Sequence, residues 1–270
     1  MESLERLRTI MKEARSTLVA FSGGVDSALV ATVAHEQLGD RAVALTAHSP
    51  TFPPEERSEA RRIAARLGMR HLIVESRELE REGYAANDGA RCYFCKTELF
   101  ELARERAVAL GLEHVMDGTI TDDLGGHRPG LKASAEHEVR HPLVEAGMNK
   151  HQVREAARSL GLSIWDKPSF ACLGSRFPVG TRVTEQRVTR IQRIESVLRT
   201  FGLKVFRVRF HEVDGVEMVR IEVGEQELEV LVRDGVRDAV IGICKQEGFQ
   251  WVTLDLEGYR MGGLSHRMPR

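Results

Sequence analysis

The chain has 270 residues, of which 42% are hydrophobic and 29% are charged, and this composition is typical of a globular protein with a buried core. Its formal charge of -1, from 39 Lys and Arg against 40 Asp and Glu, gives no electrostatic reason to expect a nucleic acid or an anionic membrane as partner. The length favours one large domain accompanied by a smaller one.

The chain contains four cysteines, and no apolar run is long enough for a secretion signal or a membrane span. We therefore expect a cytoplasmic protein, in which a Cys-x-x-Cys pair binds metal or does redox work more often than it forms a disulfide. The cysteines are Cys92, Cys95, Cys172 and Cys244.

Short apolar runs alternate with amphipathic stretches through the first part of the chain. Continuous apolar strands separated by helices are typical of a parallel sheet covered on both faces, so we expect a doubly wound α/β fold. The strands are expected at 18–21, 42–46, 72–74 and 114–116, and the helices at 27–38, 54–67, 96–110 and 149–160.

The pattern changes after a stretch rich in Pro, Gly and Ser at 166–183. We place a domain boundary near Gly180, with one domain at 1–180 and a smaller α+β domain at 181–270. In the second domain a helical stripe ends at Phe201, strands are expected at 204–210, 217–223 and 249–254, and a helix at 232–247.

The turn after the first strand predicts an anion site. It reads Ser22, Gly23, Gly24, Val25, Asp26, Ser27, and ligands bind at the carboxyl ends of parallel strands. The glycines let backbone N–H groups approach a phosphate, and the serines add hydroxyl donors. We assign Asp26 to Mg²⁺, because a carboxylate among phosphates needs a cation between them. A Walker loop would need a lysine that is absent here, and the dinucleotide G-x-G-x-x-G pattern does not fit.

Two further strand ends carry polar residues. His48 ends the second strand, and Gly118, Thr119 and Asp122 follow the fourth. The second group is expected to complete a nucleotide and magnesium site, although a solvated acidic turn would have the same composition. His48 is equally compatible with a structural role.

Cys92 and Cys95 precede the helix expected at 96–110, where the helix dipole favours thiolates. Two thiolates need further ligands: zinc takes four, whereas a 4Fe–4S cluster can take three and leave one iron open. Cys172 is the obvious third ligand, but the spacing alone also allows a structural pair. Cys244 lies in an apolar helix and is expected in the core.

Arg207 and Arg209 alternate with apolar residues along the strand at 204–210 and share one of its faces. Two guanidinium groups on one face can clamp a substrate phosphate, and a solvated basic face is the alternative. Glu222 is a weaker candidate for the same pocket.

The hexapeptide 22–27 resembles the PP-loop of the ATP pyrophosphatases, whose loop holds the pyrophosphate that leaves when a substrate oxygen attacks the α-phosphate. His48 lies where that family holds adenine and ribose. Together with that loop, further segments in the same order resemble LarE, a family of ATP-dependent sulfur transferases. These segments are 91–96, 117–130, 171–177 and 254–260.

The LarE resemblance implies an enzyme that adenylylates a carboxylate of pyridinium-3,5-biscarboxylic acid mononucleotide and converts it to a thiocarboxylate, for synthesis of a nickel-pincer nucleotide cofactor. Cys172 matches the sulfur-bearing cysteine. Members with that cysteine alone sacrifice its sulfur, whereas members with three cysteines are thought to hold a 4Fe–4S cluster, and we favour the cluster for Cys92, Cys95 and Cys172. The resemblance also implies a homo-oligomer. The expected substrate-binding residues are Ser175, Arg176, Glu195, Arg207 and Arg209.

Three rival functions are distinguishable. A tRNA thiolation enzyme needs a broad basic surface, which the near-zero charge disfavours. An amide-forming ligase of the same superfamily needs none of the three cysteines. A nucleotide-binding regulator could hold structural zinc at Cys92 and Cys95. The sequence does not indicate the sulfide donor.

Overall fold

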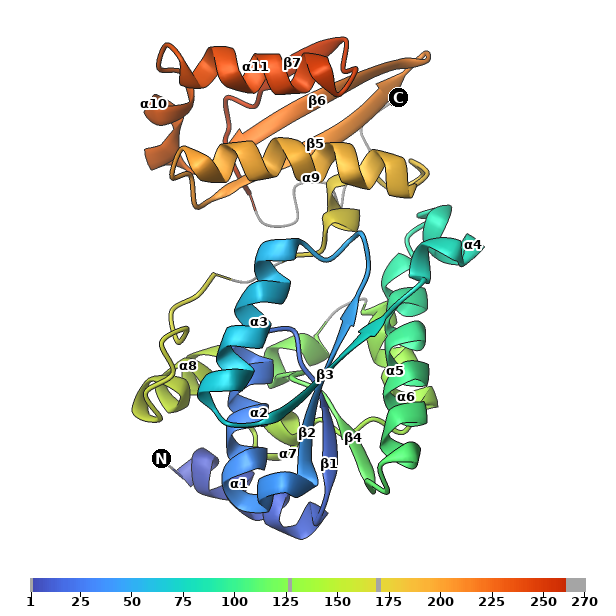
Figure 1. The fold of residues 1–270 in the computed structure, drawn as a ribbon, viewed down its shortest axis with the longest axis vertical. Coiled ribbons are helices and arrows are strands. Elements are labelled where there is room, and N and C mark those ends of the chain that lie inside the picture. The colour runs from blue at the N-terminus through green and yellow to red at the C-terminus, as the bar shows by residue number, and fades with distance from the viewer. Residues whose placement is uncertain (1, 126–127, 169–170, 261–270) are drawn as a thin grey trace. The chain divides into compact units, whose positions relative to one another are not determined.

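The computed structural model describes residues 2–125, 128–168 and 171–260. The chain divides into two compact units (Figure 1). The first unit comprises Met1–Glu78 and Ala90–Phe170, and the second comprises Leu79–Gly89 and Ala171–Arg270. Residues 126–127, in the segment 117–130, and residues 169–170, in the stretch 166–183, lie outside the described residues.

The compact units differ from the predicted domains at their boundary. The second unit begins at Ala171, not near Gly180, and it takes in the segment Leu79–Gly89. The side-chain amide of Asn87 donates to the carbonyl oxygens of Pro178 and Thr181, at 2.8 and 3.1 Å. These contacts join the segment to a distant part of the chain. No local sequence pattern predicts such a long-range contact.

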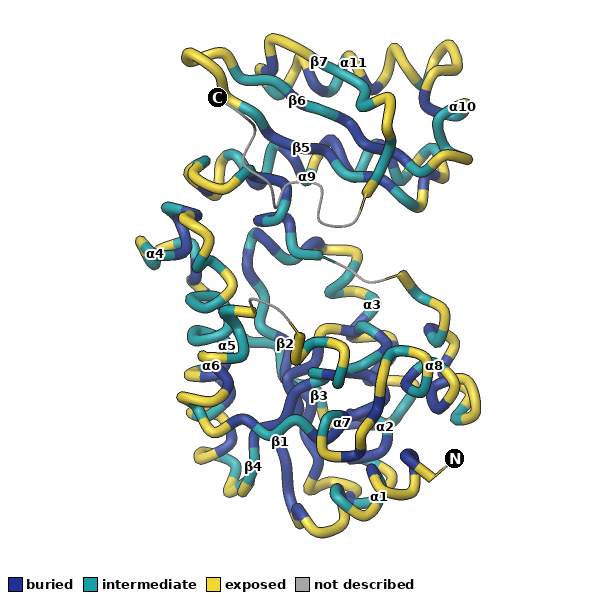
Figure 2. Tube along the Cα trace, turned by 180° about the vertical axis from the view of Figure 1, so that it is seen from behind, coloured by how far each residue is buried: buried dark blue, intermediate teal, exposed yellow. Residues whose placement is uncertain are grey.

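The first unit is built on a four-stranded parallel sheet with the order β3-β2-β1-β4. Its strands are β1 Thr17–Ala20, β2 Ala42–His48, β3 Arg70–Glu75 and β4 His114–Met116. All of β1 is buried, as the dark centre of this unit in Figure 2 shows. The α/β fold class is therefore confirmed.

Helices cover both faces of this sheet because side chains alternate along each strand. Val19 joins an apolar cluster with α1, α2, α3, α7 and α8, whereas Leu18 joins a second cluster with α5 and α6 on the opposite face. The helix bounds are α1 Glu2–Ala14, α2 Val25–Leu38, α3 Pro54–Arg66, α5 Arg91–Ala109, α6 Pro129–Glu136, α7 Pro142–Glu145 and α8 Lys150–Ser159. Short 3-10 turns lie at Gly39–Arg41, Glu78–Glu80 and Thr121–Leu124.

Helix α5 begins earlier than its pattern predicted, at Arg91 and not at residue 96. Cys92 and Cys95 therefore lie inside its first turns, not before it. The residue at the N-cap is Ala90, which makes no side-chain cap. A helix start without a Ser, Thr, Asp or Asn cap gives the sequence no local signal.

The second unit has a three-stranded sheet in the order β5-β6-β7, with β5 and β6 antiparallel and β6 and β7 parallel. Buried side chains of α9 and α11 complete its core with Phe206, Val208 and Phe210. Its elements are α4 Glu82–Ala85, the 3-10 turn Leu173–Arg176, α9 Glu185–Thr200, β5 Phe206–Val213, β6 Val216–Val223, the 3-10 turn Glu225–Glu227, α10 Leu228–Leu231, α11 Val236–Gln246 and β7 Trp251–Leu254.

The helix expected at 232–247 starts later than its pattern predicted. Helix α11 begins at Val236, after Gly235, whose φ of 83° a helix cannot accommodate, and the short α10 ends at Leu231, before the expected range. Cys244 on α11 is fully buried, and burial raises the pKa of its thiol to about 12. It belongs to the core, as expected. No helix in the described part of the chain is both long and apolar enough to cross a membrane.

Candidate active site

Hydrogen bonds of its two serines hold the turn between β1 and α2 together. The Ser22 backbone N–H donates to Ser27 Oγ at 3.2 Å, the two hydroxyls lie 3.2 Å apart, and Ser27 Oγ donates to the Gly24 carbonyl at 3.2 Å. Gly23 has a φ of 73°, which favours glycine. The turn is thus held in shape by its own side chains.

The loop after β4 packs directly against this turn. A Cβ added to Gly118 would lie 2.7 Å from the backbone nitrogen of Ser27, closer than real Cβ contacts allow. The structure therefore brings together two of the predicted segments, 22–27 and 117–119, at the carboxyl edge of the sheet. Only a glycine permits this approach of the two backbones.

Asp26, the predicted magnesium ligand, is paired with a lysine that the sequence did not single out. Lys150 Nζ lies 2.7 and 2.8 Å from the two carboxylate oxygens of Asp26. The Lys150 backbone N–H donates to Asp122 Oδ2 at 3.1 Å. Asp122 thus anchors the start of α8, and α8 presents its first side chain to the turn.

A second unpredicted lysine reaches the same turn. Lys167 Nζ lies 3.4 Å from the Gly23 carbonyl oxygen and 2.7 Å from Glu56 Oε2. Both lysines lie far along the chain from their partners and belong to no motif. A helix start after Asn149 and a lysine beside a proline were the only local signals near them.

Asp117 is a buried carboxylate at the end of β4. It accepts hydrogen bonds from His141 Nδ1 at 2.7 Å and from the Thr119 N–H at 3.0 Å, and Lys96 Nζ lies 3.4 Å away. Burial by itself would raise the pKa of Asp117, but the Lys96 charge and the His141 hydrogen bond outweigh it and hold that pKa well below its usual range. Asp117 is therefore ionised, and it connects Lys96, which follows Cys95, to the loop beside the phosphate turn.

His48 ends β2 and contacts Arg57 on α3, with 2.6 Å between the Arg57 guanidinium and His48 Nε2. Burial, and then the Arg57 charge, lower the pKa of His48. A guanidinium can only donate, so Nε2 accepts and the proton is on Nδ1. His48 is therefore neutral and held in one tautomer.

None of the four cysteines forms a disulfide. Cys92 and Cys95 lie close together at the start of α5, with Cys92 exposed and Cys95 half-buried, and Cys172 is half-buried in the second unit. In the part of the chain that the structure describes, no three or more His, Cys, Asp or Glu side chains form a metal-binding group.

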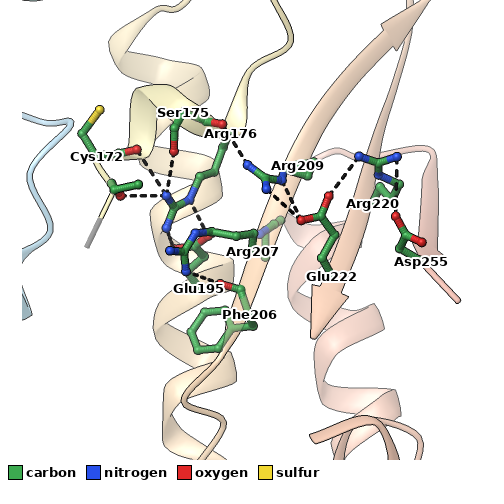
Figure 3. Close-up of polar contacts among 12 residues, drawn as sticks. Cys172, Ser175, Arg176, Glu195, Phe206, Arg207, Arg209, Arg220, Glu222 and Asp255 are labelled. Atoms are coloured by element: carbon green, nitrogen blue, oxygen red, sulfur yellow. Dashed lines mark hydrogen bonds and ion pairs between the residues drawn. The ribbon is translucent and has the colours of Figure 1, made fainter. Parts of the chain in front are cut away.

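In the second unit, Arg176 forms a buried ion pair with Glu195, through contacts of 2.8 and 2.9 Å (Figure 3). Their side chains are only 1% and 2% exposed. The Arg176 guanidinium also donates to the carbonyl oxygens of Ala171 and Cys172, at 2.8 and 3.2 Å. Arg176 and Glu195 were expected in the substrate pocket; their observed contacts hold the Cys172 backbone against α9.

Arg209 is likewise held by a buried carboxylate. It donates to Glu222 Oε2 at 2.9 and 2.8 Å and to the Ser175 carbonyl at 2.9 Å (Figure 3). Arg220 donates to the other oxygen of Glu222 at 3.0 Å. Ser175 and Glu222, both named from the sequence, therefore lie beside Arg209.

Arg207 differs from these arginines. Its guanidinium donates to the Phe206 carbonyl at 2.7 Å and lies 4.8 Å from the centre of the Tyr259 ring. Among the residues that the structure describes, no carboxylate forms an ion pair with it. Burial, and then the Arg176 charge, lower its pKa, yet a guanidinium remains protonated. Of the two arginines expected to clamp a phosphate, Arg209 is paired with Glu222, and Arg207 has no such partner among the described residues.

Comparisons with known proteins decide the family. The asparagine synthase family model matches residues 6–91. An uncharacterized protein of Synechocystis sp. is 42% identical over 99% of this chain and 98% of its own length. The pyridinium-3,5-bisthiocarboxylic acid mononucleotide synthase of Lactiplantibacillus plantarum, a LarE protein, is 34% identical over 96% of this chain and 92% of its own. This chain belongs to the LarE family.

Membership of LarE confirms the resemblance read from the motifs and makes the chain an ATP-dependent sulfur-transferring enzyme of the PP-loop superfamily. More distant similarity fits that superfamily. A glutamine-hydrolyzing GMP synthase of Aeropyrum pernix is 27% identical over 72% of this chain and 42% of its own length.

Proposed function

We propose that this LarE enzyme adenylylates a carboxylate of pyridinium-3,5-biscarboxylic acid mononucleotide, releases pyrophosphate, and converts the activated carboxylate to a thiocarboxylate. The observation that carries the proposal is the 34% identity to the Lactiplantibacillus plantarum synthase over 96% of this chain, a span that covers both compact units. A small-molecule substrate, a cytoplasmic setting and a homo-oligomeric enzyme are part of the proposal.

The phosphate turn has the chemistry needed for the first step. A substrate carboxylate oxygen attacks the α-phosphorus of ATP, and the bond to the β-phosphate breaks, so negative charge grows on the leaving pyrophosphate. Backbone N–H groups of 22–27, the α2 N-terminus and two nearby lysines, Lys150 and Lys167, would stabilise that charge. Asp26 would hold Mg²⁺, which commonly binds one or two carboxylates together with phosphates and water.

In the second step a sulfur nucleophile attacks the acyl carbon, the carbon–oxygen bond to AMP breaks, and a thiocarboxylate remains. Adenylylation is needed first because a carboxylate oxygen is a poor leaving group. We assign the substrate phosphate to Arg207, which has no carboxylate partner among the described residues, with Arg209, Ser175 and Glu195 shaping the pocket around it.

We assign the sulfur to Cys172 together with Cys92 and Cys95. Three cysteine thiols fit the ligand number of a 4Fe–4S cluster with one open iron, and two of them lie together at the start of one helix. When bound, that cluster would supply a site for sulfide and allow repeated turnover. Sacrifice of the Cys172 sulfur is the single-turnover alternative.

Anaerobic purification followed by iron and sulfide counting and a visible spectrum tests the sulfur source. We expect about four irons per chain, and loss of the cluster absorbance in Cys92→Ala, Cys95→Ala and Cys172→Ala. Cys244→Ala is the matched control and should retain iron, since Cys244 is buried in the α11 core. An iron-free protein that completes one turnover would favour the sacrificial route.

Product analysis tests the reaction itself. With ATP, Mg²⁺, the dicarboxylate mononucleotide and sulfide, we expect AMP, pyrophosphate and the thiocarboxylate in equal amounts. AMP formation with a different acceptor, such as tRNA, and none with the mononucleotide would overturn the proposed substrate.

A further inference from the structure

Asp26 and Lys150 form an ion pair in which neither group is deeply buried. Lys150 Nζ contacts both Asp26 oxygens, at 2.7 and 2.8 Å, and the side chains are 28% and 29% exposed. Asp26 lies in the first turn of α2, within the phosphate turn 22–27. The lysine ammonium therefore occupies the side of the carboxylate where a metal ion would bind both oxygens.

The two ends of Lys150 are held very differently. Its backbone N–H is bound to Asp122 Oδ2 at 3.1 Å, and the preceding Asn149 closes a capping box with Gln152 at the start of α8. The ammonium lies at the end of a flexible four-carbon stem. Lys150 thus has a fixed base and a head that can move.

We propose that Lys150 is an exchangeable cation: it neutralises Asp26 while the site lacks nucleotide, and it moves onto the departing pyrophosphate when Mg²⁺–ATP takes the carboxylate. This inference rests on the proposed assignment of Mg²⁺ to Asp26. Without the exchange, a divalent cation and an ammonium would share one carboxylate and repel each other. With it, the empty turn carries a balanced pair, and the loaded turn gains a positive group beside the phosphates.

Lys167 does not share this arrangement, although it reaches the same turn. Its ammonium is paired with Glu56 Oε2 at 2.7 Å, and these side chains are more buried, at 19% and 12% exposed. Asp26 is not among its contacts. Lys167 is therefore a matched lysine for separating the exchange from a general effect of positive charge.

The test measures Mn²⁺ binding to the full-length, nucleotide-free protein by electron paramagnetic resonance. Lys150→Met removes the cation that competes for Asp26, so the affinity for Mn²⁺ alone should rise about tenfold. Lys167→Met should change it by less than about twofold, because that lysine pairs elsewhere. The gain should disappear in Lys150→Met combined with Asp26→Asn.

The same variants are then assayed for AMP formation. Lys150→Met should lose about a hundredfold in turnover number, more than it changes the Michaelis constant for ATP, because the lysine acts on the leaving group. An unchanged Mn²⁺ affinity in Lys150→Met, or a gain that persists without Asp26, overturns the exchange even if the wild-type enzyme makes the thiocarboxylate. Absence of that product from the wild type would instead overturn the proposed function, whatever the Mn²⁺ result.

Discussion

The two units both contain clusters of charge, but they use them in opposite ways. In the first unit the Asp26–Lys150 pair is nearly a third exposed and joins a carboxylate to a flexible ammonium. In the second unit Arg176–Glu195 and Arg209–Glu222 are buried, and each guanidinium also donates to a backbone carbonyl group. A planar guanidinium suits a permanent, multiply bonded pair, whereas a lysine can release its partner at little cost.

The buried ion pairs stabilise the fold, whereas the exposed or unpaired cations are available to bind ligands. Buried pairs hold the Cys172 segment and the sheet of the second unit, and replacing them should affect folding first. Exposed or uncommitted cations, Lys150 in one unit and Arg207 in the other, should affect ligands first. Replacing one residue of each kind tests whether buried pairs affect stability and exposed or unpaired cations affect ligand binding.

The largest effect is expected for Glu195→Ala. This change leaves the buried Arg176 guanidinium without its carboxylate partner. It also removes Glu195 Oε1, which accepts a hydrogen bond from the Val208 N–H at 3.0 Å. Removing one partner of a buried pair costs about 3–5 kcal/mol, measured as the loss of unfolding free energy in urea. Glu82→Ala, which breaks the exposed pair with Arg182 in the same unit, should barely move the urea midpoint. Equal effects of the two variants would remove the distinction between the pairs.

A smaller loss of stability, but a clear loss of activity, is expected for Gly118→Ala. The added methyl group would meet the Ser27 nitrogen at 2.7 Å, so one of the two backbones must shift. Overpacking of this kind costs about 1–3 kcal/mol, and a displaced phosphate turn should slow AMP formation about a hundredfold. Gly125→Ala is the control, since nothing lies within 4 Å of its added Cβ. Normal activity in Gly118→Ala would contradict the close approach.

Arg207→Met should weaken substrate binding without unfolding the protein. Loss of a charge-assisted hydrogen bond to a phosphate is worth about 1.5–3 kcal/mol, so the Michaelis constant for the mononucleotide should rise roughly 10–100-fold. The exposed Arg233 provides the control Arg233→Met. A folded Arg207→Met enzyme with an unchanged Michaelis constant would show that another group binds the phosphate.

The smallest effect concerns acid stability and His211 on β5. Burial first, and then the Arg220 and Arg209 charges, lower the pKa of His211 to about 4, from an ordinary value near 6.5. The unfolded chain therefore binds a proton that the native protein does not, so stability falls as the pH drops from about 6.5 towards 4.

His211→Phe should remove part of that acid sensitivity. Allowing for partial exposure of the ring, we expect the stability lost between pH 7 and pH 5 to shrink by about 1 kcal/mol, measured by urea unfolding at both values. His151→Phe, at an exposed histidine of α8, should leave the difference as it is. An unaltered pH dependence in His211→Phe would argue against a neutral His211.

Much of the first unit could be predicted because its signals are local. The apolar runs around Leu18, Val43 and Val115 match β1, β2 and β4 within about two residues, and the turn 22–27 lies between β1 and α2 as expected. The start of α5 was misplaced because Ala90 caps it without a side chain. The helix expected from residue 232 begins only at Val236, because Gly235 before it has a positive φ that the apolar pattern did not predict.

By itself, the sequence determined the α/β class, the place of the phosphate turn, and the family to which the three cysteines and the turn belong. Apolar periodicity and glycine spacing act between near neighbours, so they can be read along the chain. Only the tertiary structure decided which charges meet. Lys150 contacts Asp26 across 124 positions. Arg176 forms an ion pair with Glu195, whereas Arg207 forms none with any carboxylate of the described residues. Coulomb attraction and hydrogen bonding depend on distance in space, and that distance exists only once the chain has folded.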